Sequence, residues 1–233
     1  MHHTSYVNRR EQLTDYFDRT AAAAWKQLTS DAPVGRIRAT VRAGRDEMRR
    51  TLLSWLPEDL RGVRLLDAGC GTGALAVEAA GRGARVMAVD VSPTLVELAR
   101  ERTPDNLLGQ VSYHVGDMLD ASFGDVDYVV AMDSLIHYEP DDVVAMLAEL
   151  SPRVGRAMLL TFAPSTPALR AMHRVGRLIP TRRHRAPAIV PVEEAGLCRQ
   201  IEAHTAMGDW GVIQTHRVSG GFYTSQALEI RRR

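Results

Sequence analysis

Two acidic residues follow short apolar runs, and the first of them opens a glycine-rich turn. Asp67 is followed by Gly69, Gly71 and Gly73, and Asp90 ends the next apolar run. Glycines allow a tight turn in which backbone N–H groups approach a ligand closely. A carboxylate beside such a turn would repel a pyrophosphate, so it favours a ligand that carries a positive charge. The second acid, about twenty residues further on, can accept hydrogen bonds from two ribose hydroxyls.

The glycines alone leave two other interpretations open. Gly69, Gly71 and Ala74 also fit a dinucleotide-binding fingerprint, and a glycine turn beside two solvated acids needs no ligand. Both acids fall in register with the turn, which favours a ligand. The pattern Asp67-x-Gly69-x-Gly71-x-Gly73 resembles the first motif of the class I S-adenosylmethionine (SAM) methyltransferases. The resemblance implies SAM as the cofactor, with Asp67 near its methionine end.

The elements that would position these residues alternate between strand and helix from residue 61 onward. This alternation predicts a mostly parallel sheet with right-handed crossovers, whose ligands bind outside the carboxyl ends of the strands. Ser92 and Pro93 are typical of a helix start. Two last strands would form a hairpin across Gly220 and Gly221, and residues 231–233 are expected to fray. The expected strands are 63–67, 85–90, 111–115, 128–132, 157–162, 210–218 and 222–230, and the expected helices are 73–80, 93–102, 141–150 and 193–204.

These elements predict an α/β protein with the Rossmann-like fold of class I methyltransferases. The sheet would be mostly parallel and seven-stranded, with an antiparallel last strand. Residues 61–233 would form the SAM-binding domain, and residues 1–60 an N-terminal helical cap with helices at 9–27 and 36–56. The two helices could simply pack on the domain, or they could act as a lid that excludes water from the cofactor. The sequence does not choose between these alternatives.

Acidic residues also follow the third and fourth strands, as Asp117 and Asp133. In class I methyltransferases the acid after the third strand lies near the adenine amine, so the resemblance assigns Asp117 to that position. Met118 beside it could pack on the adenine ring, although a buried methionine is the commoner explanation. Val91 and Asp133 complete the expected cofactor-binding set.

Composition and charge narrow the class of protein further. The 233 residues carry a net charge of +1 and are 45% hydrophobic, so we expect a full core and no general attraction to nucleic acid. Cys70 and Cys198 form neither a disulfide framework nor a metal cluster. The sequence contains no apolar run long enough to span a bilayer and no signal peptide. These features predict a reduced, cytoplasmic protein without a metal site of its own.

A basic insert follows the fifth strand, at about residues 164–192. Residues 151–191 contain eight arginines and no acid, and Arg174 and Arg177 belong to this set. Apolar residues at helical spacing accompany them. The combination suits an acceptor that is both apolar and anionic, or an anionic membrane surface, and a solvated basic face is the structural alternative. RNA is disfavoured because no aromatic residues alternate with the basic ones.

A second, narrower resemblance extends over nearly the whole chain. Residues 132–138, Met-Asp-Ser-Leu-Ile-His-Tyr, are similar to the segment after the fourth strand in the magnesium protoporphyrin IX O-methyltransferases of chlorophyll and bacteriochlorophyll synthesis, above all in the purple-bacterial branch. Where many relatives have a tyrosine shortly after Trp25, this chain has Leu28-Thr29-Ser30. Tyr16 is the nearest candidate for that role. The other matching segments are 16–18, 25–26, 37–38, 42–44, 161–164 and 221–223.

This resemblance implies transfer of a methyl group from SAM to a propionate of magnesium protoporphyrin IX. Tyr16 and His137 are then the candidate catalytic residues. A propionate is already ionised at neutral pH, so His137 would position the acceptor or contact its magnesium ion, and the general-base role is the alternative. The expected acceptor-binding residues are Ile136, Tyr138, Arg38, Arg42, Arg174 and Arg177, with the arginines as candidates for the second propionate.

Partners and rival functions complete the expectations. The resemblance implies a magnesium porphyrin as substrate and the large subunit of magnesium chelatase as a partner, and the basic insert predicts peripheral contact with the inner membrane. Three other functions stay open at this point. They are methylation of another small apolar acid or phenol, non-enzymatic binding of SAM, and a nicotinamide-dependent dehydrogenase.

Overall fold

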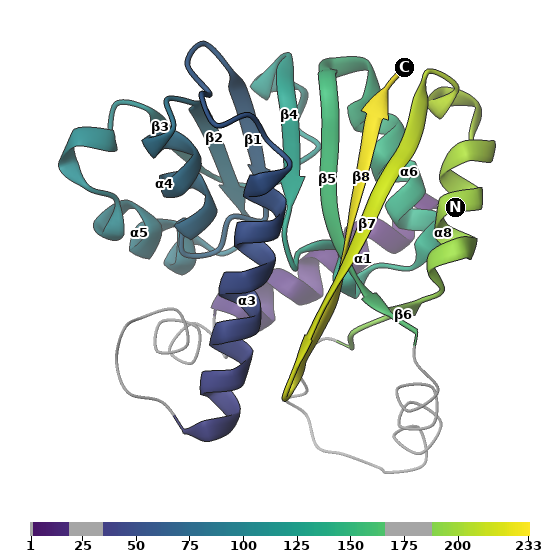
Figure 1. Ribbon diagram of the computed structural model, residues 1–233, viewed down its shortest axis with the longest axis horizontal. Coiled ribbons are helices and arrows are strands. Elements are labelled where there is room, and N and C mark those ends of the chain that lie inside the picture. Colours follow the sequence, from purple (N-terminus) through teal and green to yellow (C-terminus); the bar gives the residue numbers. More distant parts are fainter. Residues whose placement is uncertain (1, 19–34, 166–187) are drawn as a thin grey trace.

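The structure is a computed structural model that describes residues 2–18, 35–165 and 188–233. The fold is built on one β-sheet (Figure 1). The strand order is β3-β2-β1-β4-β5-β8-β7, and β6 pairs with β5 off this path. The strands are β1 (Arg64–Ala68), β2 (Arg85–Asp90), β3 (Val111–Val115), β4 (Val126–Ala131), β5 (Val154–Pro164), β6 (Pro191–Val192), β7 (Trp210–Gly220) and β8 (Tyr223–Arg232). The expected seven strands are confirmed, and the sequence did not predict the short strand β6.

Helices cover both faces of this sheet, and each face has its own buried apolar cluster. Among the described helices, none is long and apolar enough to cross a lipid bilayer. The helices are α1 (His2–Tyr16), α3 (Arg36–Ser54), α4 (Ala74–Gly81), α5 (Pro93–Arg102), α6 (Pro140–Leu150) and α8 (Glu194–Ala203). The hydroxyl of Ser92 accepts the N–H of Leu95 at 3.3 Å, so the helix start expected at Ser92 and Pro93 is confirmed.

Strands β1 to β5 pair parallel with one another, and β1 lies between β2 and β4. Asp67 pairs in register with Ala88 on one side and Val130 on the other. Because parallel strands end at the same edge of a sheet, the residues that follow β1, β2 and β4 are brought to one edge.

The C-terminal hairpin is antiparallel and extends further than expected. β8 pairs antiparallel with β5 and with β7, which confirms the antiparallel last strand. The expectation that residues 231–233 fray is wrong, because β8 continues to Arg232. The backbone N–H of Arg233 also donates to the carbonyl of Asp209 at 2.7 Å.

Helix α3 lies across one face of the sheet, and its N-terminal end reaches the tip of the β7–β8 hairpin (Figure 1). Two glycines allow this close contact. A Cβ on Gly44 would lie 2.4 Å from the Tyr223 ring, and one on Gly221 would lie 2.6 Å from the Thr40 side chain. The backbone N–H of Phe222 donates to the Thr40 hydroxyl at 3.4 Å. The hairpin and α3 therefore form one packed unit.

Helix α1 starts at His2, seven residues earlier than expected, and is described as far as Tyr16. The remainder of the expected first helix, residues 19–27, lies outside the described residues. Tyr6 and Leu13 of α1 join the buried cluster that contains α6, and Met48 and Leu52 of α3 join the cluster on the other face. Both N-terminal helices thus pack on the sheet, and the lid function and the boundary at residue 60 stay predictions.

Candidate active site

One cavity, about 300 Å³ in volume, lies at the carboxyl ends of β1, β2 and β4. The glycine turn forms one side of it, and residues of α1 and α3 form the other. Ten of the residues expected from the sequence line this cavity: Arg42, Asp67, Gly69, Gly71, Asp90, Val91, Met118, Asp133, His137 and Tyr138. The structure thus brings most of the expected cofactor-binding residues together.

The glycine turn needs backbone angles that favour glycine. Gly69, Gly71 and Gly73 have φ values of 85°, 54° and 79°, in the left-handed region. A Cβ on Gly71 would meet no atom within 4 Å, so this residue opens onto the cavity, whereas one on Gly69 would lie 2.3 Å from Ser134. Gly73 does not line the cavity, because it sits at the start of α4 against the Tyr113 hydroxyl. It shapes the turn without facing the cavity.

Asp90 holds this turn in place from the neighbouring strand. One carboxylate oxygen accepts the N–H of Gly71 at 2.8 Å, and the other accepts the N–H of Ser92 at 3.0 Å. Burial raises the pKa of Asp90, and these backbone donors act in the opposite direction. Each oxygen has a second lone pair, so the expected contact with ribose hydroxyls stays a prediction that this geometry allows.

Asp67 lies buried at the cavity and has an unsatisfied oxygen. Its Oδ2 is the one buried side-chain polar atom, in the part of the chain that the structure describes, without a hydrogen-bond partner. Burial, and next the charge of Asp90, raise the pKa of Asp67 to about 7. A positively charged ligand group would satisfy this oxygen and favour its ionised form. The residue therefore fits the cationic end of SAM.

Asp117 is placed differently from the expectation. Its carboxylate accepts the Tyr6 hydroxyl, forms an ion pair with Arg10, and accepts the N–H of Leu119 at 2.9 Å. It lines a separate hollow between α1 and α6, whereas Met118 next to it lines the cavity. A carboxylate held by two side chains of α1 is not presented to the cavity, so the contact with an adenine amine stays a prediction.

His137 and Tyr138 lie at the cavity, at the end of a short 3-10 helix, Leu135–His137. The carbonyl of Ala188 lies 3.3 Å from His137 Nδ1, and because a carbonyl only accepts, Nδ1 carries the proton. Burial lowers the pKa of His137, which favours the neutral ring with an unprotonated Nε2. Tyr138 stacks on Tyr6 of α1, with ring centroids 5.4 Å apart.

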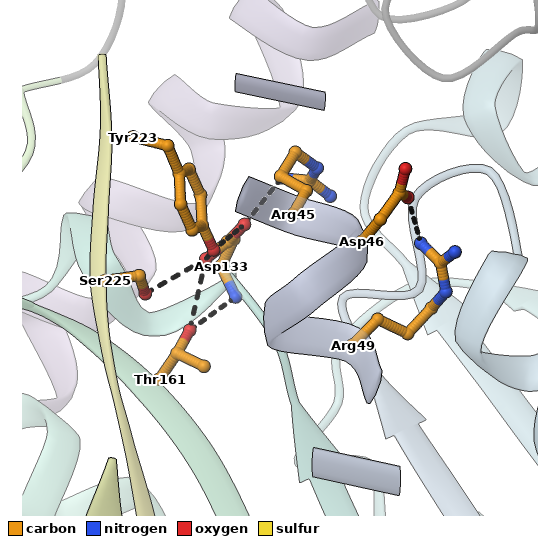
Figure 2. A network of polar contacts seen from close by, with 7 residues as sticks. All are labelled: Arg45, Asp46, Arg49, Asp133, Thr161, Tyr223 and Ser225. Atoms are coloured by element: carbon orange, nitrogen blue, oxygen red, sulfur yellow. Dashed lines mark hydrogen bonds and ion pairs between the residues drawn. The ribbon is translucent and has the colours of Figure 1, made fainter. Parts of the chain in front are cut away.

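Asp133 forms the centre of a polar network (Figure 2). It pairs with Arg45 Nη1 at 2.7 Å and accepts hydrogen bonds from three hydroxyl groups. The hydroxyl donors are Tyr223 at 3.1 Å, Ser225 at 3.4 Å and Thr161 at 3.3 Å. Asp133 lines the cavity as expected. Protein donors from three elements already hold both oxygens, so its contact with the cofactor stays a prediction.

Helix α3 contributes basic residues that the sequence analysis missed. Arg45 and Arg49 line the cavity together with the expected Arg42. Arg49 is committed to Asp46, at 2.9 Å, and to Glu78 of α4. Arg38 is exposed and does not line the cavity. The spacing of arginines at 38, 42, 45 and 49 repeats every three or four residues, and this signal could have identified the stripe from sequence.

Two further expected residues, Tyr16 and Ile136, do not line the cavity. Tyr16 ends α1 and contacts the neighbouring Phe17 edge-on, and it is Phe17 that lines the cavity. Ile136 does not line it either, and its carbonyl accepts the N–H of Val190 at 2.8 Å. Arg174 and Arg177 lie outside the described residues. The catalytic role of Tyr16 and the acceptor-binding role of Ile136 have no support in this geometry.

Comparisons with known proteins match this chain to methyltransferases. Residues 131–232 match the family model "Magnesium-protoporphyrin IX methyltransferase C-terminus", and residues 65–154 match a methyltransferase domain. A magnesium-protoporphyrin O-methyltransferase from Rhodobacter capsulatus is 47% identical, over 98% of this chain and 99% of its own length. The enzyme of the same name from Synechocystis is 30% identical, over 94% of this chain and 95% of its own.

A solved structure extends the likeness to three dimensions. The magnesium protoporphyrin IX methyltransferase from Synechocystis with bound SAH has a TM-score of 0.84 and 28% identity, and the match covers 97% of this chain and 100% of that one. The expected Rossmann-like class I methyltransferase fold is confirmed. From its identity to relatives over nearly their entire length, the chain belongs to the magnesium-protoporphyrin O-methyltransferase family.

Proposed function

We propose that this chain is a SAM-dependent O-methyltransferase that esterifies a propionate of magnesium protoporphyrin IX. The observation that carries the proposal is the distribution of charge in one cavity. An unpartnered carboxylate oxygen of Asp67 lies at the glycine turn, and Arg42 and Arg45 lie on the wall formed by α3. A cationic cofactor and an anionic acceptor would each meet opposite charge there. The names of the relatives agree with this activity.

The residues of the cavity fit SAM. Asp67 would face the ammonium group of the amino-acid end, Asp90 would accept the ribose hydroxyls, and Val91 and Met118 would border the adenine. When bound, SAM supplies an activated methyl group: its S–CH3 bond breaks as the O–CH3 bond to the carboxylate forms, leaving S-adenosylhomocysteine and a methyl ester.

The chain has to orient the reactants and exclude water. A carboxylate and a sulfonium attract each other, and both charges disappear in the transfer, so a dry site serves the reaction better than a wet one. Leu13 of α1, Phe17 directly after this helix, and Tyr138 supply apolar surface around the cavity. No proton has to leave the acceptor, because a propionate is ionised at neutral pH.

His137 is suited to contact the magnesium ion of the acceptor. With its proton on Nδ1 and donated to Ala188, its Nε2 has a lone pair and no hydrogen. This nitrogen cannot donate to a carboxylate, and an ionised carboxylate has no proton to give it. A neutral imidazole nitrogen is a common metal ligand. Because the ionised acceptor has no proton to lose, a contact of Nε2 with the magnesium ion is favoured over a general-base role.

An assay with purified protein and labelled SAM tests the proposal. We expect methyl transfer to magnesium protoporphyrin IX, slower transfer to metal-free protoporphyrin IX, and none to the dimethyl ester of the magnesium porphyrin, which has no free carboxylate. Mass spectrometry of the product should show one added methyl group. Equal turnover of a small phenol or another apolar acid, with no transfer to the porphyrin, would contradict the proposed acceptor.

Two contacts expected from the sequence stay predictions. They are binding to the large subunit of magnesium chelatase and peripheral contact with the inner membrane. The basic insert on which the membrane contact depends includes residues 166–187, which lie outside the described residues. A pull-down with the chelatase subunit and co-sedimentation with anionic vesicles would test each contact separately.

A further inference from the structure

The backbone of Asp133 is held in an uncommon conformation. Its φ of 54° makes it the one non-glycine residue with a positive φ among the described residues. Such a conformation costs free energy and persists where surrounding contacts fix it. Here the contacts come from Arg45 of α3, Thr161 of β5, and Tyr223 and Ser225 of β8 (Figure 2). Three segments distant in sequence thus converge on one carboxylate.

The network fixes the position of one guanidinium group. Arg45 Nη1 lies 2.7 Å from Asp133 Oδ2, and the Asp133 side chain is 6% exposed, whereas that of Arg45 is 21% exposed. Arg45 lines the cavity and lies in the middle of α3. Asp133 therefore anchors the guanidinium from the buried side while the arginine still borders the cavity.

The charge of Asp133 is already compensated by protein donors. Its two oxygens accept from three hydroxyl groups in addition to Arg45. These donors stabilise the negative charge of Asp133. A ligand carboxylate that approaches Arg45 from the cavity would therefore be repelled less by Asp133. Guanidinium groups bind carboxylates through charge-assisted hydrogen bonds with defined geometry. Arg49, which also lines the cavity, is held by Asp46 and Glu78.

We propose that Arg45, oriented by Asp133, binds a carboxylate group of a ligand in this cavity. The inference rests on the proposed function, which offers two sources of that chemistry: the methionine carboxylate of SAM and a propionate of the acceptor. Asp133 is then a positioning residue that acts through Arg45 and touches no ligand itself.

Direct binding measurements with paired ligands test this role. S-adenosylhomocysteine has a carboxylate, and methylthioadenosine lacks the entire amino-acid group. Magnesium protoporphyrin IX has two free carboxylates, and its dimethyl ester has none. Arg45→Gln should weaken binding of one carboxylate ligand by roughly tenfold or more and leave its carboxylate-free counterpart unchanged. The pair that responds identifies the source of the carboxylate.

Three variants control the interpretation. Arg50→Gln removes an exposed arginine of the same helix that does not line the cavity, and it should bind all four ligands normally. Arg45→Lys keeps the charge and should restore part of the lost affinity. Asp133→Asn should reduce the same selectivity for the carboxylate ligand, and combining it with Arg45→Gln should add little.

The opposite results would overturn the inference. If Arg45→Gln binds all four ligands like the unchanged protein, or loses affinity equally within both pairs, Arg45 has only a structural role. These measurements need no turnover. If the protein failed to methylate the porphyrin, the proposed function would fail, and the pair of nucleoside ligands would still decide the role of Arg45.

Discussion

Carboxylates at the ends of neighbouring strands differ in what surrounds them. Asp67 has an unpartnered oxygen, Asp90 accepts two backbone N–H groups, and Asp133 accepts from an arginine and three hydroxyls. A carboxylate whose donors are supplied by the protein has little left for a ligand. At the scale of single residues, the unpartnered oxygen of Asp67 therefore indicates that this carboxylate is the one suited to bind a cation.

Asp67 should make SAM binding depend on pH. Its pKa is raised to about 7, so below that pH it is protonated and offers no charge to a cationic ligand. Binding of a cation favours the ionised form and releases a proton. We expect SAM affinity to rise between about pH 6 and 8, by at most about tenfold per unit. Calorimetry at pH 6.5 in buffers of different ionisation enthalpy should detect the released proton.

The variant Asp67→Asn separates binding from stability. It should remove the pH dependence of SAM affinity. A folded-state pKa above the unfolded value means that ionisation opposes folding, so Asp67 costs stability increasingly as pH rises from about 4 to 7. Asp67→Asn should therefore melt at higher temperature at pH 8 without ligand. Asp125→Asn, at an exposed position, is the control, and an affinity that is flat with pH in the unchanged protein would contradict the assignment.

His137 should act on turnover and leave cofactor binding intact. His137→Ala removes a nitrogen suited to the magnesium ion, so kcat should fall and the rate difference between magnesium and metal-free porphyrin should narrow. Burial lowers the pKa of His137, so loss of activity through its protonation should occur only at a pH below the range in which an exposed histidine titrates. His216→Ala, on the exposed side of β7, is the control. Normal turnover by His137→Ala would show that the residue only packs.

At the scale of elements, the fit between α3 and the hairpin depends on Gly44. Alanine is favoured over glycine in a helix by about 1 kcal/mol, but the added Cβ would lie 2.4 Å from the Tyr223 ring, and overpacking costs about 1–3 kcal/mol. Gly44→Ala should therefore lower the free energy of unfolding by up to about 2 kcal/mol in a denaturant titration. Gly81→Ala, where no atom lies within 4 Å of the new Cβ, should cause no loss.

Helix α1 is joined to the sheet through Asp117. Its carboxylate binds Tyr6 and Arg10, so Asp117→Asn should weaken the docking of α1 by about 1 kcal/mol, since the pair is partly exposed. The substitution should then increase the rate of hydrogen exchange more in residues 2–16 than in α3. Glu11→Gln, at an exposed position of α1, should leave exchange unchanged, and an equal increase across the whole chain would indicate general destabilisation instead.

The sequence predicted elements whose signals are local. The bounds of α5 agree to the residue because Ser92 and Pro93 specify its start, and β2 and β3 also agree. It missed β6 and the extension of β8, which exist through pairing with strands distant in sequence. The predicted strand ends also placed Asp117 and Asp133 near the site. Their partners lie on α1, α3 and β8, which are distant in sequence, so no local pattern could predict these contacts.

At the scale of the whole molecule, the site joins the two ends of the chain. Arg45 comes from α3 before the first strand, and Tyr223 comes from the last strand. Both meet at Asp133, between them in sequence. The parallel strands alone supply the glycine turn, Asp67 and Asp90. The network around Asp133 requires α3 and β8 in addition to these strands.

This arrangement sets the order in which the site can assemble during synthesis. Helix α3 and β1 to β5 leave the ribosome before β8, which supplies Tyr223 and pairs with the edge of β5. Until then β5 presents an unpaired edge of the kind that promotes association between nascent chains. Gly44 of α3 likewise cannot pack against the ring of Tyr223 until β8 has been synthesised. Synthesis of β8 thus decides when the site can first hold its ligands in place.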